Sequence, residues 1–195
     1  MEIPKTLRHG RAFEKELFGV TEEEDFIDPN LKPSSRSYER SLKVIIDQVW
    51  AEYAEATCKG LDAYDPTNPI VGKTPLIFRA VKKHLPRRVN GRSSFPLNMF
   101  IAVGRTSLDW QHGVDAFFVW EGVIVTFDAS TRVKDPVKLK ADFLFLPSDL
   151  GREKLDKFGK NVADLLRYKR KHNRPPRRVQ KVLKRKSIKI DELSD

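Results

Sequence analysis

The sequence predicts an α/β domain with a small mixed β-sheet of about four strands, a central hairpin and flanking helices. Two runs of β-branched and aromatic residues, 114–120 and 123–129, flank Glu121-Gly122, which is typical of a hairpin closed by a two-residue loop. Amphipathic helical patterns occur before and after this hairpin. The order of helices and strands is therefore that of an α/β arrangement around one sheet.

The chain has 195 residues and a net charge of +10, and we expect one domain with appendages. We predict a poorly structured N-terminal arm over 1–35, an α/β domain over 36–168 and a basic tail over 169–195. No apolar run of membrane-spanning length and no signal peptide is present, which predicts a soluble intracellular protein of the cytoplasm or nucleoid with no membrane partner. A single cysteine, Cys58, excludes an internal disulfide and a cysteine-based zinc site.

Helix signals dominate the first half of the chain. A short helix is expected over 11–18, followed by an acidic patch and two prolines. From Ser35 or Ser37, both good N-caps, a long helix should run to about Cys58. Its apolar stripe consists of Leu42, Ile45, Ile46, Val49, Tyr53 and Ala56.

The remaining elements surround the hairpin. Thr74-Pro75 begins a second helix that should continue to His84, with Thr74 as the N-cap. Apolar runs over 98–104 and 140–146 are expected to be buried strands. A last helix, capped by Ser148, carries its apolar residues on one face.

The hairpin brings two aspartates together. If Trp120 pairs with Val123, Asp115 lies directly opposite Asp128, and opposed residues have Cβ atoms roughly 4.5–5.5 Å apart. Like charges at that separation repel, and a divalent cation such as Mg²⁺ between the carboxylates would remove the repulsion. The alternative is that the aspartates only end strands, and a bulge at Gly122 would turn Asp128 to the other face.

Three further residues are candidates for this site. On the long helix, Glu39 lies near the apolar stripe and Glu52 on its edge, so either acid could face the aspartates instead of water. His112 is a candidate acid or base because histidine titrates near neutrality. The alternative for His112 is a packed turn residue before Gly113.

This arrangement resembles the PD-(D/E)XK nuclease-like superfamily over roughly residues 36–146. Asp115 would match the first metal-binding aspartate of that family and Asp128 the acid of its second motif, with a helix glutamate, Glu39 or Glu52, completing the site. The resemblance implies a restriction-endonuclease-like fold and a nuclease that uses Mg²⁺ or Mn²⁺. The family expects a lysine two residues after the second acid, where this chain has Ser130.

The missing lysine could be replaced from a neighbouring element. Lys140 on the next predicted strand is the candidate catalytic cation, and Arg132 is the other. If neither acts, the departure at Ser130 would leave a protein with the fold but without the chemistry.

The positive charge is concentrated at the end of the chain. Residues 169–190 hold eleven lysines or arginines and no acid, and the rest of the chain is close to neutral. Such a segment fits a phosphate backbone, and we expect nucleic acid, DNA rather than RNA, as its partner. The predicted nucleic-acid-binding residues are Lys169, Arg170, Lys171, Arg174, Arg177, Arg178, Lys184, Arg185 and Lys186.

Three hypotheses therefore remain open. The first is a metal-dependent endonuclease or exonuclease that hydrolyses phosphodiester bonds and is anchored by the tail, as a monomer or a dimer. The second is a catalytically inactive nucleic-acid-binding or assembly protein with the same fold. The third is an interaction protein whose basic arm binds an acidic partner, because charged tails also serve as solvated ends or localisation signals.

Overall fold

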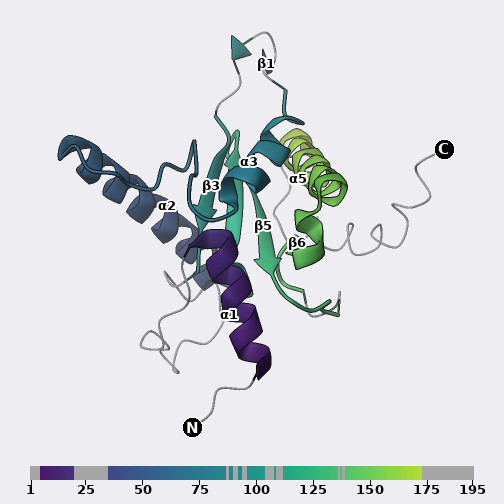
Figure 1. Cartoon of the computed structure of the whole chain (residues 1–195). Coiled ribbons are helices and arrows are strands. Elements are labelled where there is room, and N and C mark those ends of the chain that lie inside the picture. The colour runs from purple at the N-terminus through teal and green to yellow at the C-terminus, as the bar shows by residue number, and fades with distance from the viewer. Residues whose placement is uncertain are drawn as a thin grey trace.

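The computed structural model describes residues 5–19, 35–86, 88–89, 92–93, 96–103, 108, 112–135, 137 and 139–172. A four-stranded mixed sheet lies at the centre (Figure 1). Its strands lie side by side in chain order: β3 (Asn98–Ile101), β4 (Ala116–Trp120), β5 (Val123–Ala129) and β6 (Phe143–Phe145). β3, β4 and β5 pair antiparallel, and β6 is parallel to β5. The predicted class, a four-stranded mixed sheet with helices, is confirmed.

The central hairpin has the predicted register. Trp120 pairs with Val123, so the loop holds only Glu121 and Gly122. Both loop residues have positive φ angles, +52° and +76°, as a type I′ turn requires. Glycine adopts this conformation freely, whereas Glu121 adopts it against the steric preference of a residue with a Cβ atom. No bulge shifts the register between the Trp120–Val123 pair and the Ala116–Phe127 pair.

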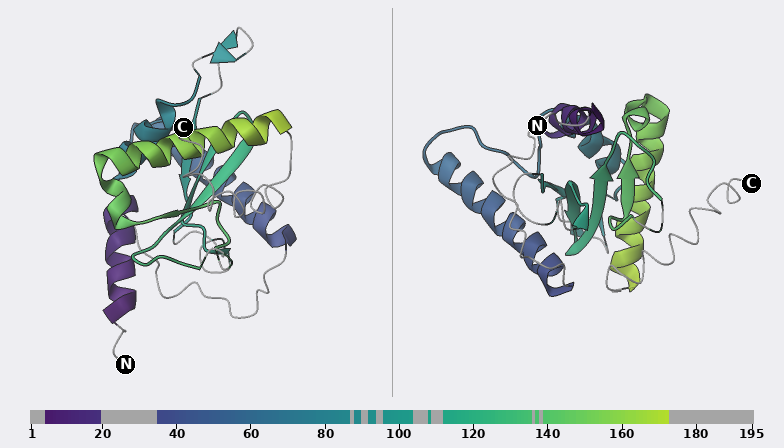
Figure 2. Two further views of the ribbon diagram at one scale, coloured as in Figure 1. Left: turned by 90° about the vertical axis from the view of Figure 1, so that its right-hand side faces the viewer. Right: turned by 90° about the horizontal axis from the view of Figure 1, so that it is seen from below.

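Helices cover both faces of the sheet (Figure 2). α2 (Ser35–Cys58) lies on one face, and α1 (Lys5–Phe18), α3 (Thr74–Lys82) and α5 (Arg152–His172) lie on the other. Alternate side chains of β4 point to opposite faces, so Phe118 joins the core under the three helices and Phe117 joins the core under α2. Among the described residues, no helix combines the length and the apolar character that crossing a bilayer requires.

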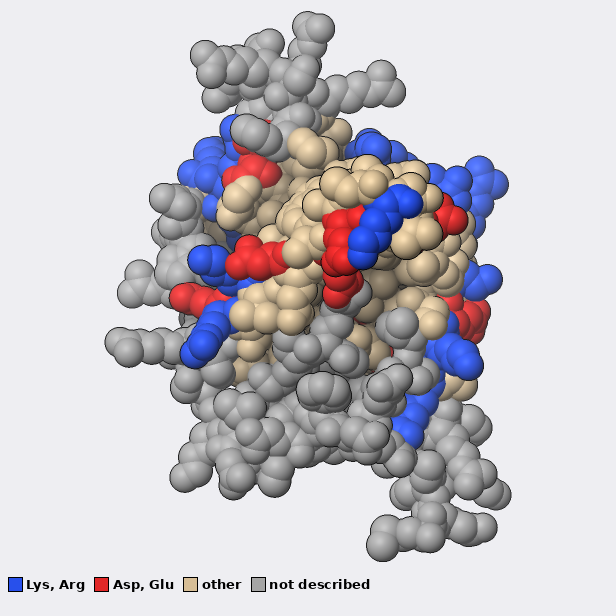
Figure 3. All heavy atoms as spheres, turned by 90° about the vertical axis from the view of Figure 1, so that its left-hand side faces the viewer, with Lys and Arg blue, Asp and Glu red and all other residues tan. Residues whose placement is uncertain are grey.

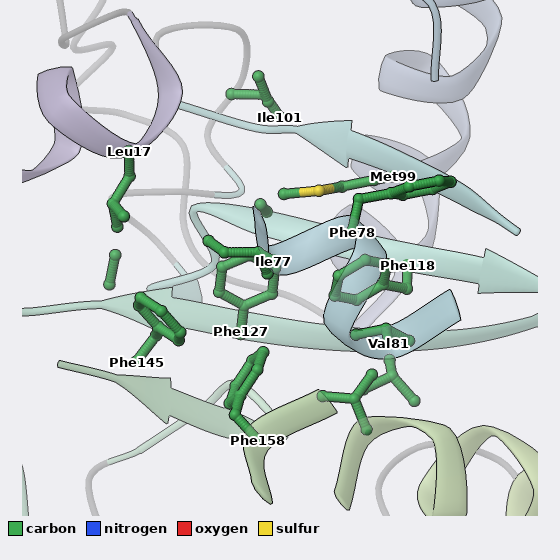
Figure 4. Packing of buried hydrophobic residues seen from close by; sticks show 14 of the residues in the cluster. Leu17, Ile77, Phe78, Val81, Met99, Ile101, Phe118, Phe127, Phe145 and Phe158 are labelled. Atoms are coloured by element: carbon green, nitrogen blue, oxygen red, sulfur yellow. The ribbon is translucent and has the colours of Figure 1, made fainter. Parts of the chain in front are cut away.

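The larger core lies under the three helices and is rich in phenylalanine (Figure 4). The Phe127 ring lies between 5.7 and 6.2 Å from the rings of Phe118, Phe158, Phe18 and Phe145. These separations are in the range of favourable aromatic pairs. One ring on β5 therefore joins the sheet to both α1 and α5.

α1 corrects the predicted organisation. The sequence predicts a poorly structured arm over 1–35, but a helix spans Lys5–Phe18, and Phe13, Leu17 and Phe18 are buried in the larger core. The Phe13 ring stacks on Phe145 at 6.4 Å. The domain therefore includes α1, because its apolar stripe is part of the layer that covers the sheet.

The helix after α2 starts and ends differently from the prediction. α3 ends at Lys82, and Lys73 occupies the N-cap position predicted for Thr74. The Thr74 hydroxyl instead donates to the Val71 carbonyl at 2.5 Å. A small hairpin, β1 (Arg88–Val89) and β2 (Arg92–Ser93), follows where the sequence predicts only a loop.

Both predicted outer strands are shorter than expected. β3 ends at Ile101, and β6 covers only Phe143–Phe145 of the predicted 140–146. After β6, a 3-10 helix (η2, Pro147–Leu150) precedes α5, which begins at Arg152 and not at Ser148. Residues 130–142 therefore form a long connection from β5 to β6, and we call this segment the β5–β6 loop.

Candidate active site

The two aspartates lie at neighbouring positions on adjacent strands. Ala116 pairs with Phe127 as the last pair of the ladder, and Asp115 and Asp128 are the next residues on the two chain segments. At this end the ladder slips by one residue, because the Asp115 N–H donates to the carbonyl of Phe127. Asp115 and Asp128 are only 3% and 4% exposed. Two carboxylates are therefore buried at one end of the hairpin, but this shift means that the predicted direct pairing of Asp115 with Asp128 is not part of the ladder.

Asp115 is held rigidly by both neighbouring strands. Its carboxylate Oδ2 accepts the backbone N–H of Ala129 at 2.5 Å, and its backbone carbonyl accepts the N–H of Ala102 on the β3 side at 2.7 Å. A carboxylate that accepts a backbone N–H is favoured in its charged form. The side chain thus continues the β-ladder beyond the last paired residue and has a fixed orientation.

Asp128 contacts a cation that the sequence analysis did not select. The Nζ atom of Lys134 lies 2.6 Å from Asp128 Oδ2, and its side chain remains 42% exposed while that of Asp128 is 5% exposed. Burial raises the pKa of the Asp128 carboxyl above its ordinary value, and the Lys134 ammonium opposes that rise. Lys134 therefore links a buried carboxylate to the protein surface.

Gly113 leaves space beside this ion pair. Its φ of +55° is a conformation that residues with a Cβ rarely adopt, and a Cβ atom there would lie 3.7 Å from Asp128 Oδ2. A methyl group would thus occupy the volume next to the carboxylate. At 3.7 Å this would be an ordinary van der Waals contact, so the glycine is required first by its backbone conformation.

His112 and Tyr38 form an aromatic pair on the α2 side of the sheet. The ring of His112, which is buried, makes an edge contact with Tyr38 of α2 at 5.0 Å between centroids. Burial is the main reason that the pKa of Tyr38 rises to about 12, while a hydrogen bond with Thr126 acts in the opposite direction. Tyr38 is therefore a neutral phenol at physiological pH. It was not predicted because its apolar body fits the helix stripe.

The predicted helix glutamates do not join the aspartates. Glu39 and Glu52 are both exposed on α2. The described residues contain no group of three or more His, Cys, Asp or Glu side chains placed to hold a metal ion. The prediction that a helix glutamate completes the site is therefore not supported. Glu39 lies near the apolar stripe and Glu52 on its edge, positions from which a long side chain can still turn to water.

The predicted replacement cations are also not those found at Asp128. Lys140 and Arg132 are exposed in the β5–β6 loop, whereas the contact with Asp128 is made by Lys134. Lys134 follows Asp128 by six residues in a polar loop, and no periodic pattern marks it. Only its short distance in sequence from Asp128, the second acid of the hairpin, could have indicated it.

A second lysine–aspartate pair lies inside the protein. Lys169 Nζ contacts Asp142 Oδ2 at 2.7 Å and donates to the Ile124 carbonyl at 2.7 Å. The two side chains are 2% and 1% exposed. Desolvation lowers the pKa of Lys169, and the charge of Asp142 opposes this shift. The pair fastens the C-terminal end of α5 to β5.

This placement corrects part of the predicted nucleic-acid-binding set. Lys169 is buried and paired, so it is not available to a phosphate. Arg170 is partly buried, with Nε 3.4 Å from the Glu121 carboxylate and the guanidinium 5.5 Å from the centre of the Trp120 ring. Lys171 is exposed. The other predicted residues, Arg174, Arg177, Arg178, Lys184, Arg185 and Lys186, lie outside the described residues.

Charge on the α2 side of the molecule is mixed. Among the residues drawn in colour, Figure 3 shows lysine and arginine interspersed with aspartate and glutamate on this face. Comparison with family models, curated proteins and solved structures found no match for this chain. We therefore infer the function from the geometry around Asp115 and Asp128.

The residues at this site fit a divalent cation of the Mg²⁺ type. Such an ion is commonly bound by one or two carboxylates, with water and substrate phosphate as the other ligands. Asp115 and Asp128 supply two carboxylates, and Gly113 places no side chain beside Asp128. Lys134 neutralises part of the charge, so an ion would share Asp128 with the ammonium or displace it.

Proposed function

We propose that this protein is a metal-dependent nuclease that hydrolyses phosphodiester bonds, with DNA as the expected substrate. One observation carries the proposal: two buried aspartates occupy neighbouring positions at the end of a hairpin, and a half-exposed lysine contacts one of them. Buried carboxylates are costly unless they have partners or bind ions. Two buried carboxylates near a partly exposed lysine support a binding or catalytic site over aspartates that only end strands.

The chemistry would be divided among three side chains. Asp115 and Asp128, with the backbone carbonyl of Ala129, are the groups that would hold Mg²⁺ or Mn²⁺, which supplies a water of lowered pKa and neutralises charge on the scissile phosphate. The Ala129 N–H fixes the Asp115 carboxylate before any ligand arrives. A ligand group that is already oriented needs no reorganisation during the reaction.

Lys134 would supply the positive charge that the family resemblance expects from position 130. Its ammonium is close to Asp128 and partly exposed, so a phosphate oxygen can approach it from solvent. A fixed cation beside the phosphate stabilises the charge that develops during cleavage. The presence of Ser130 therefore does not by itself argue against activity.

Nucleic acid is the proposed substrate because of the charge of the chain. The net charge is +10, and the basic residues concentrate from position 169 onward. Each phosphate that a lysine or arginine neutralises releases counterions, which drives binding at low salt. This term is independent of sequence, and any preference for particular bases would need other contacts.

A second candidate is a nucleic-acid-binding protein that keeps this fold without catalysis. Two observations favour it. Lys134 already pairs with Asp128, and among the described residues no third carboxylate or histidine joins the two aspartates. In that protein the Lys134–Asp128 pair would serve stability alone.

Cleavage by purified protein separates the two candidates. We expect Mg²⁺- or Mn²⁺-dependent cleavage of plasmid or oligonucleotide DNA that falls at least about a hundredfold in Asp115→Asn, Asp128→Asn and Lys134→Met. Lys43→Met, an exposed lysine of α2, and Glu52→Gln, an exposed acid of the same helix, are the matched controls and should retain activity. Full cleavage in both aspartate variants would disprove the site, and binding without any cleavage would favour the second candidate.

A further inference from the structure

The β5–β6 loop presents two apolar side chains to solvent. Val133 is 80% exposed and Val137 is 82% exposed, the highest values among the large hydrophobic residues of the described part. Single exposed apolar residues are common, but two on one short loop are a contact surface of small area.

Both ends of this loop are fastened to the sheet. The Ser130 N–H donates to the Phe145 carbonyl at 2.9 Å, and the Asp142 N–H donates to the Thr126 carbonyl at 3.1 Å. Ala141 is buried in the core under α2, so the chain re-enters the protein just before β6. Residues 131–135 and 137 are exposed between these anchors. The loop therefore projects from a fixed base.

The same loop is positively charged and reaches the aspartates. Arg132, Lys134 and Lys140 are exposed along it together with the acid Asp135, whereas the other acid of the loop, Asp142, has a buried side chain that is paired with Lys169. Asp135 uses its carboxylate within the loop, where it accepts the Val137 N–H at 2.9 Å. Lys134 connects the loop to Asp128 at 2.6 Å. Lys134 is therefore part of both the exposed loop and the candidate site.

We propose that the β5–β6 loop is a substrate-contacting surface that binds a nucleic-acid strand beside the aspartates. Arg132 and Lys140 contact phosphates, and Val133 and Val137 pack against sugars and base edges, as apolar side chains do in other nucleic-acid-binding surfaces. A protein partner fits less well, because lysine is depleted in the centre of protein–protein interfaces. This inference rests on the proposed function, since it assigns a role to a surface next to the same site.

Binding in EDTA tests the loop without cleavage. Fluorescence anisotropy with labelled single-stranded and duplex DNA compares the full-length wild type with Val133→Ser/Val137→Ser, with Arg132→Ala and with Leu61→Ser/Ile70→Ser. The last variant is the matched control, because Leu61 and Ile70 are also well exposed but lie between α2 and α3. Thermal melting of each variant shows whether the fold is retained.

The two kinds of contact give different expected results. The valine variant should bind about five- to tenfold more weakly with an unchanged dependence on salt, because apolar contacts release no counterions. Arg132→Ala should reduce the slope of log affinity against log salt by about 0.9, the value for one phosphate contact. The control should bind like the wild type.

Equal binding by wild type, loop variants and control would overturn the inference, as would an equal loss in the control. Wild type that binds no DNA in EDTA would also overturn it. Failure of the proposed function is a separate result. It appears as absence of metal-dependent cleavage by the wild type, whatever the loop variants do to binding.

Discussion

Two lysine–aspartate pairs in this protein have almost the same geometry and opposite surroundings. Lys169 lies 2.7 Å from Asp142 and Lys134 lies 2.6 Å from Asp128. The first pair is closed to solvent on both sides, whereas in the second the lysine is 42% exposed above a buried carboxylate. The distance between charged atoms therefore does not distinguish a structural pair from a candidate functional one, and the access of solvent does.

The closed pair also has more partners within the protein. Asp142 Oδ2 accepts the backbone N–H of Thr126 at 2.9 Å in addition to the lysine, and Lys169 donates to the Ile124 carbonyl. The other carboxylate oxygen of Asp142, Oδ1, is buried without a hydrogen-bond partner in the described structure. Removing Lys169 would leave this carboxylate buried without its counter-charge. The open pair can exchange its partner for water, an ion or phosphate.

The largest expected difference is in stability. Lys169→Met should lower the free energy of unfolding by about 3–5 kcal/mol, because it leaves a buried charge unpaired. Lys134→Met should cost less than this, because solvent reaches this pair and water can replace the half-exposed ammonium beside Asp128. Urea denaturation measures both. Adding Asp142→Asn to Lys169→Met should recover part of the loss, and equal losses in the two single variants would contradict the comparison.

The burial of Tyr38 should make the stability of the protein depend on pH. Its pKa is raised from 10.0 to about 12 in the folded protein. A raised folded pKa contributes stability below pH 10 that is lost as pH rises through 10 to 12, on the order of 2–3 kcal/mol. Absorbance titration should show a tyrosine component near pH 12 that disappears in Tyr38→Phe and remains in Tyr53→Phe. A titration unchanged by Tyr38→Phe would contradict this burial.

Alanine variants of Gly113 and Gly122 distinguish the cost of backbone strain from an effect on ion binding beside Asp128. Gly113 and Gly122 have φ angles of +55° and +76°, so alanine at either should cost about 1–2 kcal/mol of stability. Only at Gly113 does the added methyl group lie beside Asp128, whereas nothing lies within 4 Å at Gly122. Titration of Mn²⁺ by calorimetry should show weaker binding in Gly113→Ala alone. Equal binding in both variants would show that the ion does not use this space.

The hairpin and the long helix were predictable because local patterns determine them. Glu121-Gly122 between two apolar runs fixed the turn, and the register of Trp120 with Val123 then placed Asp115 beside Asp128. The stripe of α2 predicted its bounds, Ser35–Cys58. α1 was underestimated because its helix signal is short, and its stability comes from packing on the sheet.

The partners of the aspartates were not predictable in the same way. Lys134 lies in a loop with no periodicity, and Lys169 is 27 positions from Asp142, so neither contact follows from a local pattern. Charge alone assigned Lys169 to the basic tail, although the helix places it on the buried side. Glu39 and Glu52 illustrate the reverse error, since proximity to a stripe does not turn a glutamate inward.

The most direct test of the central claim is thermal melting in EDTA and then with increasing Mg²⁺ or Mn²⁺. We expect the melting temperature of the wild type to rise with metal concentration, as it does for any ligand that binds only the folded state. We expect no rise in Asp115→Asn or Asp128→Asn. Asp142→Asn, in the closed pair, should keep the metal response even though it is less stable. An equal rise in wild type and both site variants, or no rise in the wild type, would contradict a metal site at Asp115 and Asp128.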